Sequence, residues 1–316
     1  MTEIKNVLLT GDCLIESDKI ASGSVDLILT DLPYGTVKDF GVGSGLYHGM
    51  IGKTEWDDAI DPKVVYAVAN RILRKNGKMV LFSQEPYTSR LITEANANIP
   101  FSYRMVWEKD HFANALVARK APVSYFEDVL VFSKTHDTDG IHPLRPYFRQ
   151  VFEYIGLTKK RIIDEIGQRA DHVFRTESTQ FSICTEDTYE NLISAFQIDR
   201  MPGFRPFSDI AKETDGLLSV FNLWEGGKYK SNILRYKKDY DGYHPTQKPV
   251  LLLEDLIKTF SNAGDTVVDL TAGSGSTAVA AINAGRNFVV IEQDAEYAAI
   301  AQRRIDEAKA VQVGGL

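Results

Sequence analysis

The chain has 316 residues, of which 44% are hydrophobic and 25% charged, a composition typical of a soluble globular protein with a full apolar core. Its net charge of −7 argues against a protein that coats nucleic acid by charge alone, although it does not exclude an enzyme with one local basic cleft. We expect no membrane partner, because no apolar run is long enough to span a bilayer, and no metal or disulfide framework, because only Cys13 and Cys184 are cysteines.

The N-terminal part predicts alternating strands and a helix. Its strands are short apolar runs bounded by turn residues, and its helix begins at a proline and stops before a glycine. The expected strands are residues 6–10, 25–30, 78–82, 101–108 and 128–132, and the expected helix is residues 62–74.

The segment Thr30-Asp-Leu-Pro-Tyr-Gly-Thr36 leaves the second expected strand. Turn chemistry accounts for Pro33 and Gly35. It does not account for the acid at Asp31 or the aromatic ring at Tyr34. We therefore treat this segment as a candidate substrate loop as well as a turn.

The middle of the chain, from about His136 to Arg235, has a different texture. It contains 13 Lys and Arg residues against 15 Asp and Glu residues, so it is not basic overall. Thr158 is placed to cap a helix that ends at Gly167, and Thr185 is placed to cap a second helix. The connection between these two helices is too long for a helix-turn-helix in the strict sense. We expect a small, mainly helical subdomain inserted into the sheet-forming part.

The C-terminal part predicts a strand at residues 265–270, a glycine loop at 271–276, a helix at 277–284 and a strand at 287–292. A further helix follows from Asp294. A strand, glycine loop, helix and strand in this order form the unit of a doubly wound parallel sheet.

The glycine loop contains Gly273-Ser-Gly-Ser-Thr-Ala278, which fits the fingerprint of an adenosine cofactor site, although a glycine turn without a ligand has the same residues. Glu292, at the end of the next strand, is placed to accept hydrogen bonds from ribose hydroxyls. Asp269 lies just before the loop, where its carboxylate repels a pyrophosphate but suits a cationic ligand. The pattern therefore favours S-adenosylmethionine over a dinucleotide.

Three motifs in one order now carry a family resemblance. Asp31-Leu-Pro-Tyr34, His244-Pro-Thr-Gln-Lys-Pro249 and Asp269-Leu-Thr-Ala-Gly-Ser-Gly-Ser-Thr277 resemble the amino-methylating DNA methyltransferases, in the motif order of their β class. The resemblance implies a doubly wound, Rossmann-like α/β sheet that binds S-adenosylmethionine, with an inserted, mainly helical target-recognition subdomain. The implied limits are residues 1–136 and 236–316 for the catalytic domain and residues 137–235 for the insertion.

This sequence departs from the family pattern at several positions. Leu32 and Leu270 stand where the family usually has proline, and Thr271 stands where a phenylalanine is common. The family's His-Glu pair before a late strand appears as Phe126-Glu127, which leaves no histidine role to carry over. None of these changes removes a polar group that the implied chemistry needs.

The resemblance implies roles for the catalytic motif. The side chain of Asp31 and the backbone carbonyl of Leu32 accept the hydrogens of the target amine, and Tyr34 stacks on a base flipped out of the duplex. Pro33 holds Leu32 in an extended conformation, so the carbonyl keeps its direction. The cofactor-binding candidates are Asp12, Cys13, Asp31, His244, Thr246, Gln247, Lys248, Asp269, Thr271, Ala272, Gly273, Ser274, Gly275, Ser276, Thr277, Glu292 and Gln293.

Two of these assignments have simpler alternatives. Asp12 either reaches the adenine of the cofactor or only caps a strand end. Lys248, with a helix that begins near Pro249, either holds the methionine carboxylate or only marks an ordinary helix start.

The DNA-binding candidates lie in two places. The first is a polar and basic stretch between two late strands, expected to be a loop over the flipped base or a solvated surface loop. The second is a basic cluster in the insertion, with Arg145 and Arg149 as further candidates. The residues assigned to DNA are Lys109, Asn114, Arg119, Lys120, Lys159, Lys160 and Arg161.

We expect a DNA methyltransferase that acts on adenine N6 in double-stranded DNA, in the cytoplasm of a bacterium or a phage-infected host. N4-cytosine is the nearest alternative, and a nicotinamide-dependent oxidoreductase or a non-catalytic DNA-binding protein are more distant ones. The sequence leaves open a homodimer, a companion restriction enzyme, RNA as substrate and the recognition sequence.

Overall fold

The computed structural model describes residues 4–33, 59–113, 118–120, 122–137, 142–178, 180–215, 218–243 and 246–314. Tyr34, Asn114 and His244, which the sequence analysis assigned to the site, lie outside the described residues.

The chain divides into two compact units. One unit contains the two ends of the chain, up to Thr135 and from Val220, and the other contains the residues between them. The sequence predicts the second boundary at Arg235, whereas the second unit ends at Ser219. Strand β6 (Ile233–Arg235) pairs in parallel with β4 (Phe101–Ala113), so it belongs to the sheet of the first unit.

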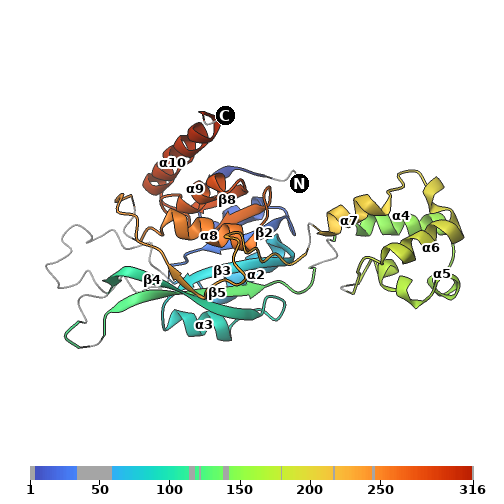
Figure 1. Cartoon of the computed structure of the whole chain (residues 1–316), viewed down its shortest axis with the longest axis horizontal. Coiled ribbons are helices and arrows are strands. Elements are labelled where there is room, and N and C mark those ends of the chain that lie inside the picture. Colours follow the sequence, from blue (N-terminus) through green and yellow to red (C-terminus); the bar gives the residue numbers. More distant parts are fainter. Residues whose placement is uncertain are drawn as a thin grey trace. The chain divides into compact units, whose positions relative to one another are not determined.

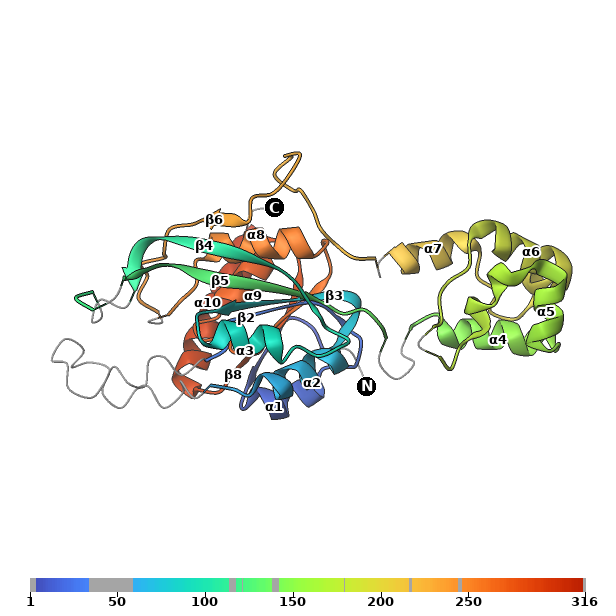
Figure 2. The same cartoon turned by 90° about the horizontal axis from the view of Figure 1, so that it is seen from below.

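The described residues of the first unit form a sheet of eight strands in the order β1-β8-β7-β2-β3-β5-β4-β6 (Figures 1 and 2). Strands β1, β8, β7, β2 and β3 run parallel to their neighbours in this order, whereas β5 is antiparallel to β3 and β4. The C-terminal strands β7 and β8 lie between β1 and β2, which confirms that both ends of the chain build one sheet. The remaining bounds are β1 (Val7–Thr10), β2 (Val25–Thr30), β3 (Leu73–Ser83), β5 (Ser124–Ser133), β7 (Thr266–Asp269) and β8 (Asn287–Glu292).

Helices cover both faces of this sheet, as expected for a doubly wound fold (Figures 1 and 2). Because side chains alternate along a strand, Leu27 and Leu29 join the core beneath one set of helices, while Ile28 joins the core on the other face. The first face is covered by α8 (Val250–Phe260), α9 (Ser276–Asn283) and α10 (Ala295–Gly314), and the second by α1 (Cys13–Glu16), α2 (Pro62–Ile72) and α3 (Tyr87–Thr93). None of the helices formed by the described residues is long and apolar enough to cross a lipid bilayer.

Several element ends differ from the sequence-based expectation. Helix α2 ends at Ile72, and β3 begins at Leu73, five residues before the expected strand. The reason lies in Arg74, which was expected in the helix but is buried and donates to Asp26 Oδ1 at 2.5 Å. A buried ion pair of this kind overrides a local helix preference.

The second unit is helical, as predicted, around a core rich in aromatic residues such as Phe148, Phe181 and Tyr189. Its α5 begins after Thr158, whose Oγ1 accepts from Arg161 N, and ends at Gly167, as predicted. Thr185 precedes α6, but its hydroxyl contacts the Thr188 hydroxyl and caps no backbone N–H. The helices are α4 (Arg145–Ile155), α5 (Lys159–Ile166), α6 (Glu186–Phe196) and α7 (Phe207–Asp215), with 3₁₀ turns at Gln168–Ala170, His172–Phe174 and Ile198–Arg200.

Helix α4 was not predicted. It ends at Gly156, which adopts the left-handed conformation with φ of 66° and donates to the Phe152 carbonyl. Only Gly156, Leu157 and Thr158 separate α4 from α5. The two helices predicted from the sequence are α5 and α6, whose connection is long, whereas the short connection lies between α4 and α5.

Candidate active site at the carboxyl edge of the sheet

The ends of β2 and β7 bring two motifs of the sequence together. These parallel strands pair Leu27 with Val267 and Ile28 with Val268, and the same offset places Asp31 beside Thr271. The Thr271 hydroxyl donates to the Asp31 carbonyl at 2.9 Å and lies 2.8 Å from the Thr30 hydroxyl. The loop after β2 is therefore tied directly to the glycine loop.

Asp269 lies just before the glycine loop and accepts hydrogen bonds from residues at both ends of it. Its carboxylate accepts from Thr277 Oγ1 at 2.5 Å and from Thr271 N at 3.0 Å. It is only 4% exposed, and burial raises the pKa of this carboxyl. The acidic side chain proposed to disfavour a pyrophosphate thus lies at the start of the loop.

The two loop glycines serve different purposes. Gly273 has a φ of 52°, and its N–H donates to Glu292 Oε2 at 2.7 Å. Gly275 has a φ of 81°, and a Cβ atom there would lie 2.8 Å from the Cβ of Ala301 in α10. Both glycines belong to the predicted cofactor fingerprint, but Gly275 is required by the approach of a helix.

Glu292 lies at the end of β8, as predicted, and the other oxygen of its carboxylate accepts from Asp294 N at 2.8 Å. Burial raises the pKa of Glu292. Gly11 N donates to the Glu292 carbonyl at 2.9 Å. The next residue, Asp12, therefore follows the end of β1, the strand that pairs with β8. Asp12 Oδ1 accepts from Leu14 N at 2.8 Å, so Asp12 caps the start of α1, whereas the alternative considered from the sequence was the cap of a strand end.

Four charged side chains meet on the face of the sheet covered by α8. Lys248 Nζ lies 2.5 Å from Asp31 Oδ2 and 3.1 Å from Glu127 Oε2. Lys109 Nζ pairs with the other oxygen of Glu127. The Lys248 ammonium also lies 5.1 Å from the ring centre of Phe82, on the strand between those that carry Asp31 and Glu127.

The pKa values of this group follow from burial and mutual charge. Burial raises the pKa of Asp31, Lys248 opposes that rise and Glu127 adds to it, which leaves the Asp31 carboxyl at about 6. Burial acts in the same direction on Glu127, but Lys248 and Lys109 together lower its pKa. The two carboxylates raise the pKa of Lys248 despite its burial. The cluster therefore contains two carboxyl groups and two amino groups. Of the two carboxyl groups, Asp31 has the pKa that lies closer to neutral pH.

The assignment of Lys248 as a carboxylate anchor needs correction. Its ammonium is occupied by Asp31 and Glu127, and the first N–H of α8, at Val250, donates to Asp239 Oδ2 at 2.8 Å. Both expected donors are thus engaged by carboxylates of the chain itself. Gln247 differs: it is 6% exposed, and its Nε2 atom is buried with no hydrogen-bond partner among the described residues.

Arg304 of α10 was not foreseen. It is buried, and its Nη1 donates to the Ser274 carbonyl at 2.7 Å and to the hydroxyls of Ser274 and Ser276 at 3.0 Å each. Its guanidinium also lies 4.7 Å from the ring centre of Tyr243. A lone arginine in an amphipathic helix carries no sequence signal for such a role. Glu127 had a signal, because Phe126-Glu127 stands where the resembled family has a His-Glu pair.

The remaining predicted positions occupy less specific places. Leu32 is buried in the core, so only its backbone is available to a ligand. Cys13 is buried, and burial raises the pKa of its thiol to about 11. Ala272 N donates to the Ile291 carbonyl, which joins the glycine loop to β8. Thr246 directly precedes Gln247, and Gln293 directly follows the last residue of β8.

The DNA-binding candidates are spread over both units. Lys109 was expected in a loop but is buried within β4, so the assignment to a DNA-contacting loop is wrong for this residue. Arg119 and Lys120 are exposed. Arg145 is only 2% exposed and donates to backbone carbonyls of its own unit, which removes it as a DNA candidate.

The basic cluster of α5 also contains both paired and exposed side chains. Lys159 pairs with Asp171 at 2.6 Å. Lys160 and Arg161 are exposed and take no part in the ion pairs formed by the described residues.

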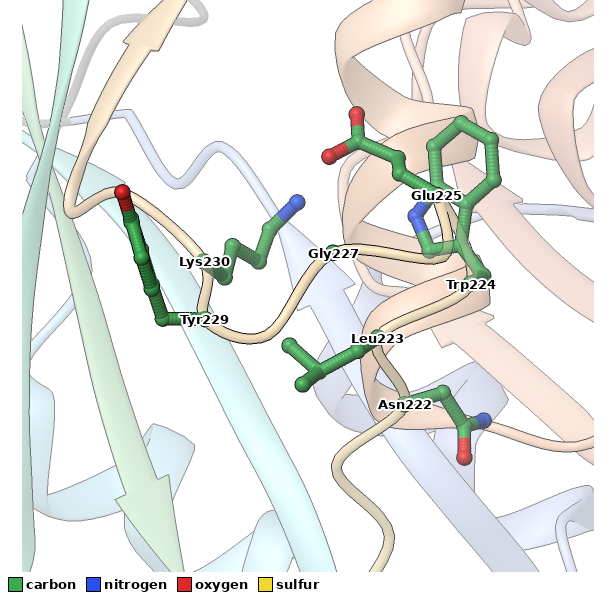
Figure 3. Close-up of a pocket in the computed structure, with 7 residues that line it drawn as sticks. All are labelled: Asn222, Leu223, Trp224, Glu225, Gly227, Tyr229 and Lys230. Carbon is green, nitrogen blue, oxygen red and sulfur yellow. The ribbon is translucent and has the colours of Figure 1, made fainter.

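A shallow pocket lies apart from these residues, along the chain segment before β6. Figure 3 shows its lining, Asn222, Leu223, Trp224, Glu225, Gly227, Tyr229 and Lys230. Asp255 of α8 fastens this segment, since Oδ1 accepts from Trp224 Nε1 at 2.8 Å and from Lys230 Nζ at 2.5 Å. The pocket contains no residue of the predicted site.

Comparisons with known proteins agree with the motif order. A model of the N6/N4 DNA methylase family matches residues 25–303. The DNA adenine methyltransferase YhdJ of Escherichia coli is 27% identical over 302 residues, which cover 95% of this chain and 83% of the relative. The type II methyltransferase M.HindIII of Haemophilus influenzae is 22% identical, with 91% of each chain covered.

Solved structures resemble the fold at low sequence identity. The M1.HpyAVI–SAM complex superposes with a TM-score of 0.51, at 19% identity, over 95% of this chain and 98% of the other. The cytosine-N4-specific PvuII DNA methyltransferase gives a TM-score of 0.55, at 15% identity, over 98% of this chain and 92% of the other. The doubly wound architecture is therefore that of known methyltransferases.

Proposed function

The chain belongs to the N6/N4 DNA methylase family, which uses S-adenosylmethionine, and on that premise we propose that it methylates the N6 amino group of an adenine in double-stranded DNA. The observation that carries the proposal is Asp31, whose Oδ1 atom is buried with no hydrogen-bond partner among the described residues. Its Oδ2 atom is held by Lys248 and its carbonyl by Thr271. A fixed carboxylate with one free oxygen suits a primary amine that has two hydrogens to donate.

The cofactor side of the site fits the same proposal. Gln247 offers a buried, unpaired N–H donor, and Glu292 presents a carboxylate at the end of β8. We assign Gln247 to the carboxylate of S-adenosylmethionine and Glu292 to its ribose. When bound, this cofactor supplies a methyl group on a sulfonium sulfur, which keeps the bonding electron pair as the methyl leaves.

The residues of the chain do the rest by positioning. Asp31 Oδ1 and the Leu32 carbonyl accept the amine hydrogens and direct the nitrogen lone pair towards the methyl group. The nitrogen becomes cationic as the new N–C bond forms, and Asp31 stabilises that charge until one proton leaves to solvent. Tyr34 supplies a stacking surface for the flipped base, worth about 1–3 kcal/mol against the cost of unstacking.

We also propose that the helical unit contacts the DNA. Helices α4 and α5 are joined by three residues that include a glycine, which is the connection of a helix-turn-helix. In such motifs the N-terminal residues of the second helix face the bases or phosphates. In this chain those residues include Lys160 and Arg161, both exposed.

The decisive test is mass analysis of nucleosides from duplex DNA incubated with the protein and S-adenosylmethionine. We expect N6-methyladenine in DNA treated with the native chain and none in DNA treated with Asp31→Ala. If only N4-methylcytosine forms, the cytosine alternative replaces the proposal. If the native chain forms neither methylated base, the proposed methyl transfer is wrong.

A further inference from the structure

The charge cluster at the site has an internal order that the motifs do not reveal. Its four members come from four segments of the chain. Asp31 follows the end of β2 and Lys248 precedes α8, while Glu127 lies in β5 and Lys109 in β4. Each ion contacts the next, so the four side chains form a chain of alternating sign. Asp31 is the member at the open end, with 21% of its side chain exposed against 6–7% for the other three.

Lys248 is held on three sides. Its ammonium contacts Asp31 and Glu127 and lies over the ring of Phe82. Strands β2 and β5 are separated by β3, a span of about 9–10 Å across the sheet, so the ammonium bridges the two carboxylates above the middle strand. Glu127 is fixed in turn by Lys109, whose ammonium lies 5.2 Å from the ring centre of Trp107.

The consequence for Asp31 is an asymmetric carboxylate. Oδ2 is bound by Lys248, while Oδ1 has no partner among the described residues. The backbone cannot swing to exchange the two oxygens, because the Asp31 carbonyl accepts from Thr271. Both ends of the residue are therefore fixed before any substrate arrives.

We propose that Lys248 is a positioning residue for Asp31, anchored by Glu127 and Lys109, and that Gln247 rather than Lys248 binds the cofactor carboxylate. The inference rests on the proposed methyl transfer. Adjacent residues of one motif thus divide two tasks. Gln247 holds the donor, and Lys248 holds the group that receives the amine.

The charges around Asp31 explain why it needs this partner. The ionised groups that face it are Lys248, Glu127 and Asp269, so Lys248 is the cation among two anions. Without Lys248, burial and the two neighbouring carboxylates all raise the pKa of Asp31 further. A protonated Asp31 has an O–H group where the amine needs an acceptor, so methyl transfer stops.

The experiment separates the two tasks with Lys248→Met and Gln247→Leu in the full chain. For each variant the pH dependence of kcat on duplex DNA and the Kd for S-adenosylmethionine are measured. For the native chain we expect kcat to rise with pH through about 6. Lys248→Met should move this rise upward by about 1–3 pH units and leave the cofactor Kd unchanged.

Gln247→Leu should do the opposite. It should weaken cofactor binding about tenfold and leave the pH at which kcat rises in place. If Lys248→Met instead weakens cofactor binding and the pH profile stays in place, Lys248 is the carboxylate anchor and the proposal is wrong.

Two further measurements keep the result decisive. Lys248→Gln replaces Lys248→Met if the latter does not melt like the native chain, and Lys109→Met should give a smaller shift of the pH profile in the same direction. If the native chain methylates neither base, the proposed function fails, yet the two cofactor Kd values still decide which residue holds the carboxylate.

Discussion

The catalytic edge and the helical unit handle charge in opposite ways. At the edge, Asp31, Lys248, Glu127 and Lys109 are mostly buried, and their partners lie far away in the sequence. In the helical unit, whose interior is mostly apolar and aromatic, most charges lie at the surface, with Arg145 as a buried exception. Two ion pairs among its described residues join positions three or four residues apart, as Arg175 does with Asp171.

The difference indicates what each region requires. A buried, long-range charge chain has one arrangement, because losing a partner leaves an ion without compensation. Exposed, local pairs contribute little and rearrange easily. The first suits a reaction that needs one fixed acceptor, and the second suits a surface that adapts to a polyanion.

The largest expected effect is at Asp31. Asp31→Ala should lower kcat by about 10²-fold or more, because it removes the acceptor for the amine. Cofactor binding, measured by calorimetry, should be retained, since the proposal assigns the cofactor to Gln247 and Glu292, which the substitution leaves in place. Asp31→Asn retains an acceptor oxygen without the charge and serves as the control; near-native turnover of Asp31→Ala contradicts the assigned role.

Gly275 tests whether the cofactor loop depends on packing. Gly275→Ala should destabilise the fold by about 2–3 kcal/mol, because it adds a clash with Ala301 to a left-handed backbone. Gly285 has a φ of 71°, and a Cβ atom there would meet no atom within 4 Å, so Gly285→Ala should cost only about 1 kcal/mol. Equal losses in urea unfolding would show that backbone conformation alone matters at Gly275.

Thr271 tests the tie between the two loops. Thr271→Val removes the hydroxyl that contacts Asp31 and Thr30, and should cost about 1 kcal/mol of unfolding free energy and several-fold in kcat. Thr271→Ser retains the hydroxyl and should behave like the native chain. A Val variant with native kcat would mean that the Asp31 backbone is fixed by other contacts.

The smallest effect is expected in the helical unit. The double variant Lys160→Ala with Arg161→Ala should weaken DNA binding a few-fold. It should also reduce the slope of log K against log salt concentration by about two. The matched control removes Arg149 and Lys212, which also subtracts two positive charges but takes them from ion pairs with Glu177 and Asp209. Equal effects of the two pairs, measured by fluorescence anisotropy, would point to net charge rather than to α5.

Much of the fold was predictable because it depends on local patterns. Val25–Thr30 and Asn287–Glu292 are apolar runs with few alternatives to a buried strand, and they form β2 and β8. Parallel strands end at the same edge of a sheet, so the approach of Asp31 to Thr271 follows from the strands alone.

The charge chain was not predictable in the same way. Lys248 and Asp31 are 217 residues apart, and their contact depends on where α8 begins. Lys109 was assigned to a loop because β4 extends five residues beyond the expected strand, to Ala113. Glu127 was visible only through its place in the family's His-Glu pair, and a single sequence does not identify its partner.

The interleaved order of the sheet has a consequence for synthesis on the ribosome. β2 ends one residue before Asp31, yet its neighbour β7 follows about 240 residues later, and β8, which separates β7 from β1, emerges later still. A nascent chain therefore holds β1 and β2 without the strands that belong between them, and such long-range pairing forms slowly. Asp31 meets Thr271 only after synthesis has passed Thr271, so a product truncated before that residue lacks the contact between the two loops.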